Sequence, residues 1–178
     1  MGFLFKSLTV LLMAGTVVLS ASSAKVLNME IQETIQKFNN RFKGARDFLS
    51  RTEGYLVFPN VYKAGFVVGG EYGEGGMVIK GKVVEYYKMF SASFGFQAGA
   101  QRKAIIIAFL TSNALESFRK SDKWKAGVDG SIAFVDWGGG IDLSTIDLKK
   151  SIVAIAFDQR GLMGSLSLEG AVFTKVRK

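Results

Sequence analysis

The sequence of 178 residues contains no histidine, no cysteine and only one proline. Without histidine, the chain lacks the side chain that most often acts as general base, metal ligand or pH switch. Without cysteine, it has no disulfide, no thiol nucleophile and no zinc site of the usual kinds. The patterns G-x-S-x-G and G-x-x-x-x-G-K-[ST] are absent too. Carboxylate or Ser–Lys chemistry remains, but no motif supports either. The sequence therefore predicts that the protein is not an enzyme and uses no metal and no cofactor.

The N-terminus has the composition of an export signal. One cation, Lys6, precedes an uncharged and largely apolar run over residues 8–19. Ser22 and Ala24 are small residues at the positions that a signal peptidase reads before a cut at Lys25. The apolar run is shorter than the roughly 20 residues of a spanning helix, which favours a cleaved signal over a retained anchor. No cysteine follows it, so an acylated lipoprotein anchor is excluded.

We therefore expect residues 1–24 to be a signal peptide and residues 25–178 to form one exported domain. This domain would be periplasmic or peripheral on the cell envelope. The whole chain has a formal net charge of +8, and loss of the leader with its single lysine leaves +7. A positive excess favours an anionic partner such as phospholipid head groups. Nucleic acid is disfavoured by export, and ordinary solubility charge is the alternative explanation.

Residues 26–50 show the periodicity of one amphipathic helix. Apolar residues recur there at spacings of three and four and fall on one stripe. Four cations, Lys37, Arg41, Lys43 and Arg46, lie mostly off that stripe. The stripe either packs on the helix's own domain, which we expect in solution, or enters a membrane interface while the cations meet phosphates.

Short runs of strand-forming residues follow from Tyr55 onward. Glycines or charges bound these runs, and Pro59 with Asn60 is expected to form a turn after the first one. Such closely spaced strands predict an antiparallel meander, because parallel crossovers need longer connections. The run AIIIAFL, residues 104–110, should be buried on both faces of the sheet.

One short helix should interrupt the strands, starting at the capping-box pattern of Asn113 and Glu116. Beyond it, residues 140–150 could form a strand or a long connection. The predicted fold class is α+β, with an antiparallel, barrel-like β-sheet, an N-terminal amphipathic helix and a short inserted helix. An outer-membrane barrel is disfavoured by these helices and by the strongly apolar run.

The segment AGFVVGGEYGEGGMVIKG, residues 64–81, contains seven glycines. A dinucleotide-binding loop needs G-x-G-x-x-G between a strand and a helix, whereas Gly70, Gly73 and Gly75 run in the reverse order before another strand. We expect these glycines to form tight turns and bulges, or to allow close approach of another segment.

A second cluster, residues 91–101, has Gly95, Gln97, Gly99 and Gln101 at every second position. In a strand, all four would share one face. That face suits either a lipid head group or a helix or strand that packs into it.

Three blocks together resemble the SYLF domain family in order and spacing. They are GYLVFPNVYKAGFVVGGEYGEGGMVI (54–79), SASFGFQAGAQ (91–101) and GLMGSLSLEGAVF (161–173). The resemblance implies a lipid-binding domain for phosphoinositides and other anionic phospholipids. It also implies that lipid binding involves an amphipathic N-terminal helix and a cationic surface, here residues 26–50. Eukaryotic members act near actin and membrane remodelling, and bacterial members are often exported.

The chain departs from the family pattern in two places. EYYKMFSAS (85–93) replaces a Trp–Ser–Pro segment, and Arg102 and Lys103 stand where an acidic residue is common. These changes bear on lipid selectivity more than on fold. Because an exported bacterial protein would not routinely meet phosphoinositides, anionic phospholipids in general are the expected ligands.

The sequence thus predicts non-catalytic binding of anionic phospholipids through a cationic helix and a glycine-rich sheet. The alternative is an envelope module whose glycine-rich face receives a strand or helix of a protein partner. The residues expected to contact lipid are Lys37, Arg41, Lys43, Arg46, Lys63, Gln97, Gln101, Arg102 and Lys103.

Overall fold

The structure is a computed structural model. It describes residues 22–65, 68–94, 99–135, 142–147, 149–160 and 168–178. The helices in these ranges are α1 (Ala24–Arg41), α2 (Ala45–Ser50), α3 (Ser112–Lys120) and the 3-10 turn η1 (Leu143–Thr145). The strands are β1 (Gly54–Gly65), β2 (Val68–Ile79), β3 (Lys82–Phe94), β4 (Gly99–Phe109), β5 (Lys123–Lys125), β6 (Ala133–Val135), β7 (Ile152–Arg160) and β8 (Val172–Val176). The expected signal peptide lies mostly outside the described residues.

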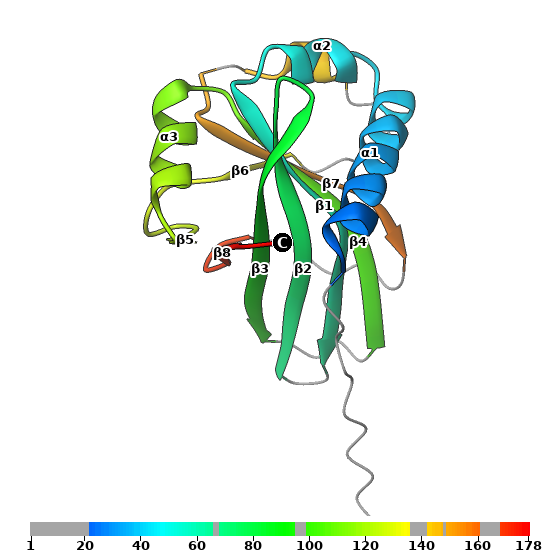
Figure 1. The fold of residues 1–178 in the computed structure, drawn as a ribbon, viewed down its shortest axis with the longest axis vertical. Helices are drawn as coiled ribbons and strands as arrows, with labels where there is room; N and C mark the ends of the chain where they lie inside the picture. The colour runs from blue at the N-terminus through cyan, green and yellow to red at the C-terminus, as the bar shows by residue number, and fades with distance from the viewer. Residues whose placement is uncertain (1–21, 66–67, 95–98, 136–141, 148, 161–167) are drawn as a thin grey trace, which may run out of the picture.

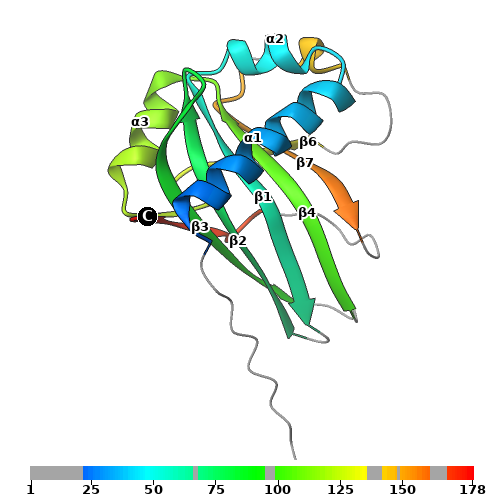
Figure 2. The ribbon, with the colours of Figure 1, turned by 45° about the vertical axis from the view of Figure 1, so that its right-hand side comes forward.

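The strands form one sheet in the order β5-β8-β3-β2-β1-β4-β7-β6. Figures 1 and 2 show this sheet curling into a half-barrel, with α1 and α3 on opposite faces. The predicted α+β class, the N-terminal helix and the inserted helix are confirmed. All described pairs are antiparallel except β6 with β7, which is parallel. The predicted meander holds for β1 to β3, but β4 pairs with β1 and not with β3. The antiparallel prediction fails at β6 and β7, between which the chain passes through η1.

The expected turn at Pro59 is wrong, because β1 runs straight through this residue. The register of β1 shifts between Phe58 and Val61 against β4, and between Val57 and Asn60 against β2. This double irregularity is a bulge, where a proline without an N–H group interrupts no ladder hydrogen bond.

Most of the glycine-rich segment lies in a single strand, β2, so Gly69 to Gly76 form no turn. The expected tight turn lies at the end of the segment, at Lys80 and Gly81, whose φ angles of 50° and 77° match the two-residue turn that the twist of the strands favours. An expected bulge lies between Met77 and Val78, where the register of β2 against β3 shifts. The next element is β3, so the rejection of a phosphate-binding loop is confirmed.

The glycines of β2 do allow the close approach that was the alternative expectation. A Cβ atom at Gly75 would lie 2.3 Å from the carbonyl oxygen of Val57 and 2.6 Å from the Phe58 ring. A Cβ atom at Gly76 would lie 2.8 Å from Cδ1 of Ile31 in α1. Gly76 therefore lets the N-terminal helix pack directly on the strand.

The single helix expected over residues 26–50 is two helices. Gly44 has φ +74°, a left-handed conformation, and it separates α1 from α2. A Cβ atom there would lie 2.7 Å from the backbone nitrogen of Ser144. The break thus lets η1 pack beside it, where the backbone N–H of Leu143 donates to the carbonyl of Lys43. No helix in the described ranges combines the length and the apolar character needed to cross a bilayer.

Each face of the sheet has its own core. On the α1 face, Leu27, Ile31 and Phe38 pack on strand residues such as Val57 and Ile106. The α3 face has a separate core, to which Phe118 of α3 and Trp124 of β5 belong. Strand β4 contributes to both. From Ala104 to Phe109, its alternate residues enter opposite cores and are buried, which confirms the prediction for these residues. Leu110, the last residue of the predicted run, is partly buried.

Helix α3 begins earlier than the capping-box pattern indicated. Its N-cap is Thr111, whose hydroxyl accepts from the backbone N–H of Ala114. Glu116 instead pairs with Lys120 one turn later. Thr111 caps the helix in place of Asn113, because its side chain precedes the first helical turn, where backbone N–H groups lack partners.

We expect Gly75→Ala to reduce the free energy of unfolding by about 1–3 kcal/mol, because the new methyl group collides with backbone and an aromatic ring. Urea denaturation measures this change. Gly70→Ala is the matched control, since its Cβ atom would come no closer than 3.5 Å to any neighbour. Equal stability of the two variants would contradict the close packing of β2.

Candidate functional site

The four cations predicted on the N-terminal helix lie on or between α1 and α2. All four residues are exposed, while the apolar stripe between them is buried in the α1-face core. Lys37 pairs with Glu33 at 2.9 Å, and Lys43 pairs with Asp142 at 3.2 Å across the break between the helices. In this structure the helices therefore present charge outward and keep their apolar side on the sheet, as expected for the chain in solution.

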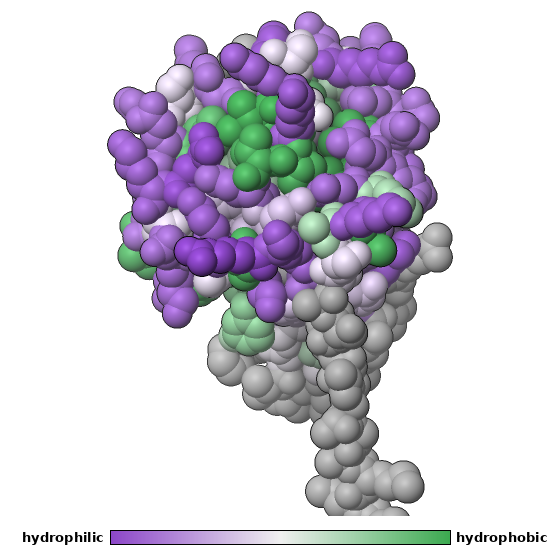
Figure 3. All heavy atoms as spheres, viewed as in Figure 1, coloured by the Kyte–Doolittle hydropathy of each residue, from purple (hydrophilic) through white to green (hydrophobic). Residues whose placement is uncertain are grey.

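A groove of about 470 Å³ lies between α1, α2 and the β2–β3 hairpin. Figure 3 shows hydrophobic side chains around this hairpin, ringed by hydrophilic ones. The groove is lined by Ile35, Asn39, Arg46, Leu49, Ser50, Thr52, Glu53, Gly54, Tyr55, Val78, Lys80 and Gly81.

The groove combines an apolar floor with a net positive rim. Arg46 and Lys80 contribute two positive charges to the lining, against one negative charge from Glu53. Burial raises the pKa of the Tyr55 phenol, so this group stays protonated and can donate a hydrogen bond. The side-chain oxygen of Asn39 is buried without a hydrogen-bond partner. An amphipathic anion fits this chemistry, because its apolar part meets the floor and its charge meets the cations.

A smaller cleft of about 130 Å³ lies on the other side of α1. Two of the predicted cations, Lys37 and Arg102, line it. Arg102 donates to Asn60 at 2.8 Å and lies 3.7 Å from Asp158. Three carboxylates line the same cleft, those of Glu30, Glu33 and Asp158. Since these outnumber the cations, the cleft is less suited to an anion than the groove.

Two further predicted lysines point to the α3 face. The Lys103 amine lies 3.0 Å from Glu71, and the Lys63 amine lies 4.0 Å from the same carboxylate oxygen. Lys103 and Glu71 are buried, and burial lowers the pKa of the Lys103 amine although Glu71 opposes this shift. The register places Gln101 opposite Lys63, whereas Gln97 lies outside the described residues. The predicted residues are thus divided between both faces of the sheet.

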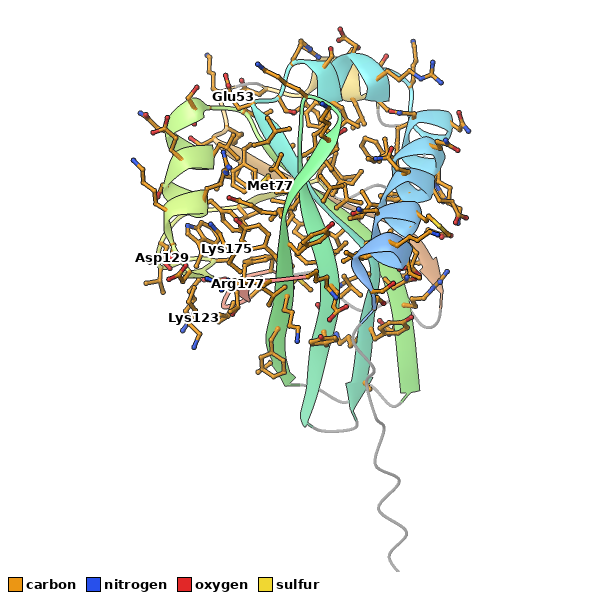
Figure 4. All side chains as sticks on the ribbon, in the orientation of Figure 1. Glu53, Met77, Lys123, Asp129, Lys175 and Arg177 are labelled. Carbon is orange, nitrogen blue, oxygen red and sulfur yellow. The ribbon has the colours of Figure 1, made fainter. Side chains whose placement is uncertain are left out.

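A second ionic cluster fastens α3 to the sheet. Arg119 donates two hydrogen bonds to the carboxylate of Glu85, both at 3.1 Å, and the hydroxyl of Tyr87 donates to it at 2.8 Å. Lys175 of β8 lies between α3 and β3 (Figure 4), 3.4 Å from the same carboxylate. Although burial opposes the shift, the hydrogen bonds from Arg119 and Tyr87 and the adjacent positive charges hold the pKa of Glu85 below its ordinary value.

The sequence predicted Arg46 but not the other polar residues of the groove, among them Asn39, Tyr55 and Lys80. These residues are distant in sequence and meet only because α1 docks over the hairpin. No signal in the sequence indicated that Lys80 would meet Arg46.

Within the described ranges, no three acidic side chains gather as a metal-binding group, and the clustered carboxylates pair with cations. The chain belongs to the family described as Las17-binding protein actin regulator, Ysc84, whose model matches residues 90–178. This family is one of binding domains and is not a known enzyme family. This match confirms the resemblance to SYLF domains and covers the chain from the end of β3 onward. No curated protein matches the chain.

We expect Glu85→Gln to lower the free energy of unfolding at pH 7 by about 2 kcal/mol, because charged hydrogen bonds from Arg119 are weakened. The folded-state pKa of Glu85 is depressed, so its contribution is complete above pH 4.5 and is lost as the pH falls through the folded pKa. Urea titrations at several pH values should show the gap between wild type and variant closing below pH 4.5. Glu116→Gln, in an exposed pair, is the control and should change little. A gap that persists unchanged at acidic pH would contradict this assignment.

Proposed function

We propose that this protein binds anionic phospholipids at a membrane surface without chemically changing them. The observation that carries the proposal is the groove between α1, α2 and the β2–β3 hairpin, where Arg46 and Lys80 border an apolar floor. The head-group phosphate would lie by the two cations, and acyl carbons would cover the floor formed by Ile35, Leu49 and Val78. The expected export of residues 25–178 would bring this surface to the lipids of the cell envelope.

We further propose that the helices stay docked during binding. Ile31 and Phe38 are 0% exposed, and burial of each such side chain contributes about 1.5–3 kcal/mol. Release of α1 would also expose Val57, Val78 and Ile106 of the sheet. A membrane could cover the freed helix stripe, but it would have to cover the stripped sheet as well. Binding by the docked form avoids both costs.

A protein partner is the second candidate function. The family description names Las17 binding and actin regulation, so a related protein surface is a reasonable alternative for this chain. The glycine-rich strand already receives a helix, the chain's own α1, at Gly76. A partner would therefore need to use another surface of the domain. Capture that survives detergent and high salt would favour this candidate over lipid.

We expect the double variant Arg46→Gln/Lys80→Gln to bind vesicles of phosphatidylcholine and phosphatidylglycerol about thirtyfold more weakly than wild type at low salt. Each cation near an anionic surface contributes about 1 kcal/mol, less when salt screens it. Co-sedimentation at low and high salt measures the change. Pure phosphatidylcholine vesicles should pellet little protein in either case.

The matched control is Lys149→Gln/Lys150→Gln. It removes the same charge from another groove, of about 430 Å³, on the α3 face. The control should bind like wild type. If the control binds more weakly and the Arg46 and Lys80 variant binds like wild type, the lipid site lies on the α3 face. Equal binding to neutral and anionic vesicles would refute the electrostatic proposal.

A further inference from the structure

Three aromatic side chains form a row across the α1 face of the sheet. Tyr62 of β1 pairs in register with Tyr72 of β2, which pairs with Phe90 of β3. Their chain neighbours Val61 and Met89 belong to the α3-face core, so the aromatic residues point to the other side. Tyr62 is 51% exposed and Phe90 is 56% exposed. We call Tyr62, Tyr72 and Phe90 the aromatic row.

No described helix covers the aromatic row. Figures 1 and 2 show β1, β2 and β3 continuing well beyond the N-terminal end of α1. The row lies next to that end, because Ser22, just before α1, donates its backbone N–H to Glu74, and Glu74 accepts from the hydroxyl of Tyr72. The aromatic row is therefore an exposed continuation of the surface on which α1 packs.

The next row of the sheet consists of small residues, Ala64, Gly70 and Ala92. A Cβ atom at Gly70 would lie 3.5 Å from the Phe90 ring, so this ring extends over the bare glycine. The result is a low, flat surface with two large rings open to solvent. A flat aromatic surface suits a broad partner better than a small molecule, which needs a concave site.

The charges around the aromatic row favour an anionic partner. Arg102 pairs in register with Tyr62, and Lys88 lies on the same side of β3 as Phe90. The nearby carboxylates are already occupied, since Glu74 accepts from Lys178 and Asp158 lies by Arg102. Lys88 has no ion pair with any residue that the structure describes.

We propose that the aromatic row enters the head-group region of an anionic phospholipid bilayer and orients the domain on it. Tyrosine and other amphipathic rings favour this region, and Lys88 and Arg102 lie where lipid phosphates would be. This inference rests on the proposed function and adds a second contact, at the opposite end of α1 from the groove. A bilayer that touches both contacts lies along the α1 face.

Phe90→Trp places a fluorescent probe in the aromatic row, and Val128→Trp is the matched control in a loop where Val128 is 72% exposed. The tryptophan fluorescence of both variants is measured with vesicles of phosphatidylglycerol and brominated phosphatidylcholine. Wild type is measured in the same way, so that the signal of the native tryptophans can be subtracted. We expect the added signal at position 90 to fall at least twofold relative to unbrominated vesicles, and the signal at position 128 to stay unchanged. Phe90→Ala should weaken vesicle binding about tenfold, whereas Val128→Ala should not.

Bound protein with an unquenched probe at position 90, or Phe90→Ala binding like wild type, would overturn the inference and leave the proposed function intact. If neither wild type nor any variant binds vesicles, the proposed function itself fails. Sedimentation without lipid tests whether a second copy of the chain, and not a bilayer, covers the aromatic row. A wild-type dimer that Phe90→Ala converts to a monomer would also overturn the bilayer assignment.

Discussion

The docking of α1 on the bare backbone of β2 is the contact on which the rest of the structure depends. Gly76 leaves room for Ile31, whose side chain would otherwise meet a Cβ atom at 2.8 Å. This close approach lets Ile31 enter the α1-face core, where it is fully buried. It also forms one wall of the groove, because α1, α2 and the β2–β3 hairpin meet only while the helix is docked.

Docking also separates the two kinds of chemistry along the helices. The apolar stripe stabilises the domain, while the cations remain at the surface, partly neutralised by Glu33 and Asp142. In the proposed binding mode, the cationic amphipathic helices do not insert into lipid. Arg46 of α2 lines the same groove as Lys80 of the β2–β3 hairpin, so the charges of the helices and of the sheet meet at one surface.

The sequence predicted features that depend on local periodicity. The unbroken apolar run AIIIAFL predicted burial on both faces, and the stripe beginning at Leu27 predicted a helix packed on its own domain. Features set by distant contacts were missed. The break at Gly44 depends on Ser144 and Asp142, a hundred residues away, and Pro59 is accommodated by bulges against two neighbouring strands. The aromatic row exists only through strand register, so neither its shared face nor its exposure could be derived from the sequence alone.

Hydrogen exchange of the α1 backbone amides, with and without vesicles containing phosphatidylglycerol, tests most directly whether the docked domain is the lipid-binding form. We expect amides around Ile31 and Phe38 to remain as protected in the bound protein as in the free protein. Protection should increase only at exposed positions, such as those near Lys80 and Phe90. If amides of β1 and β2 beneath the helix lose protection on binding, α1 has left the sheet and the account is contradicted.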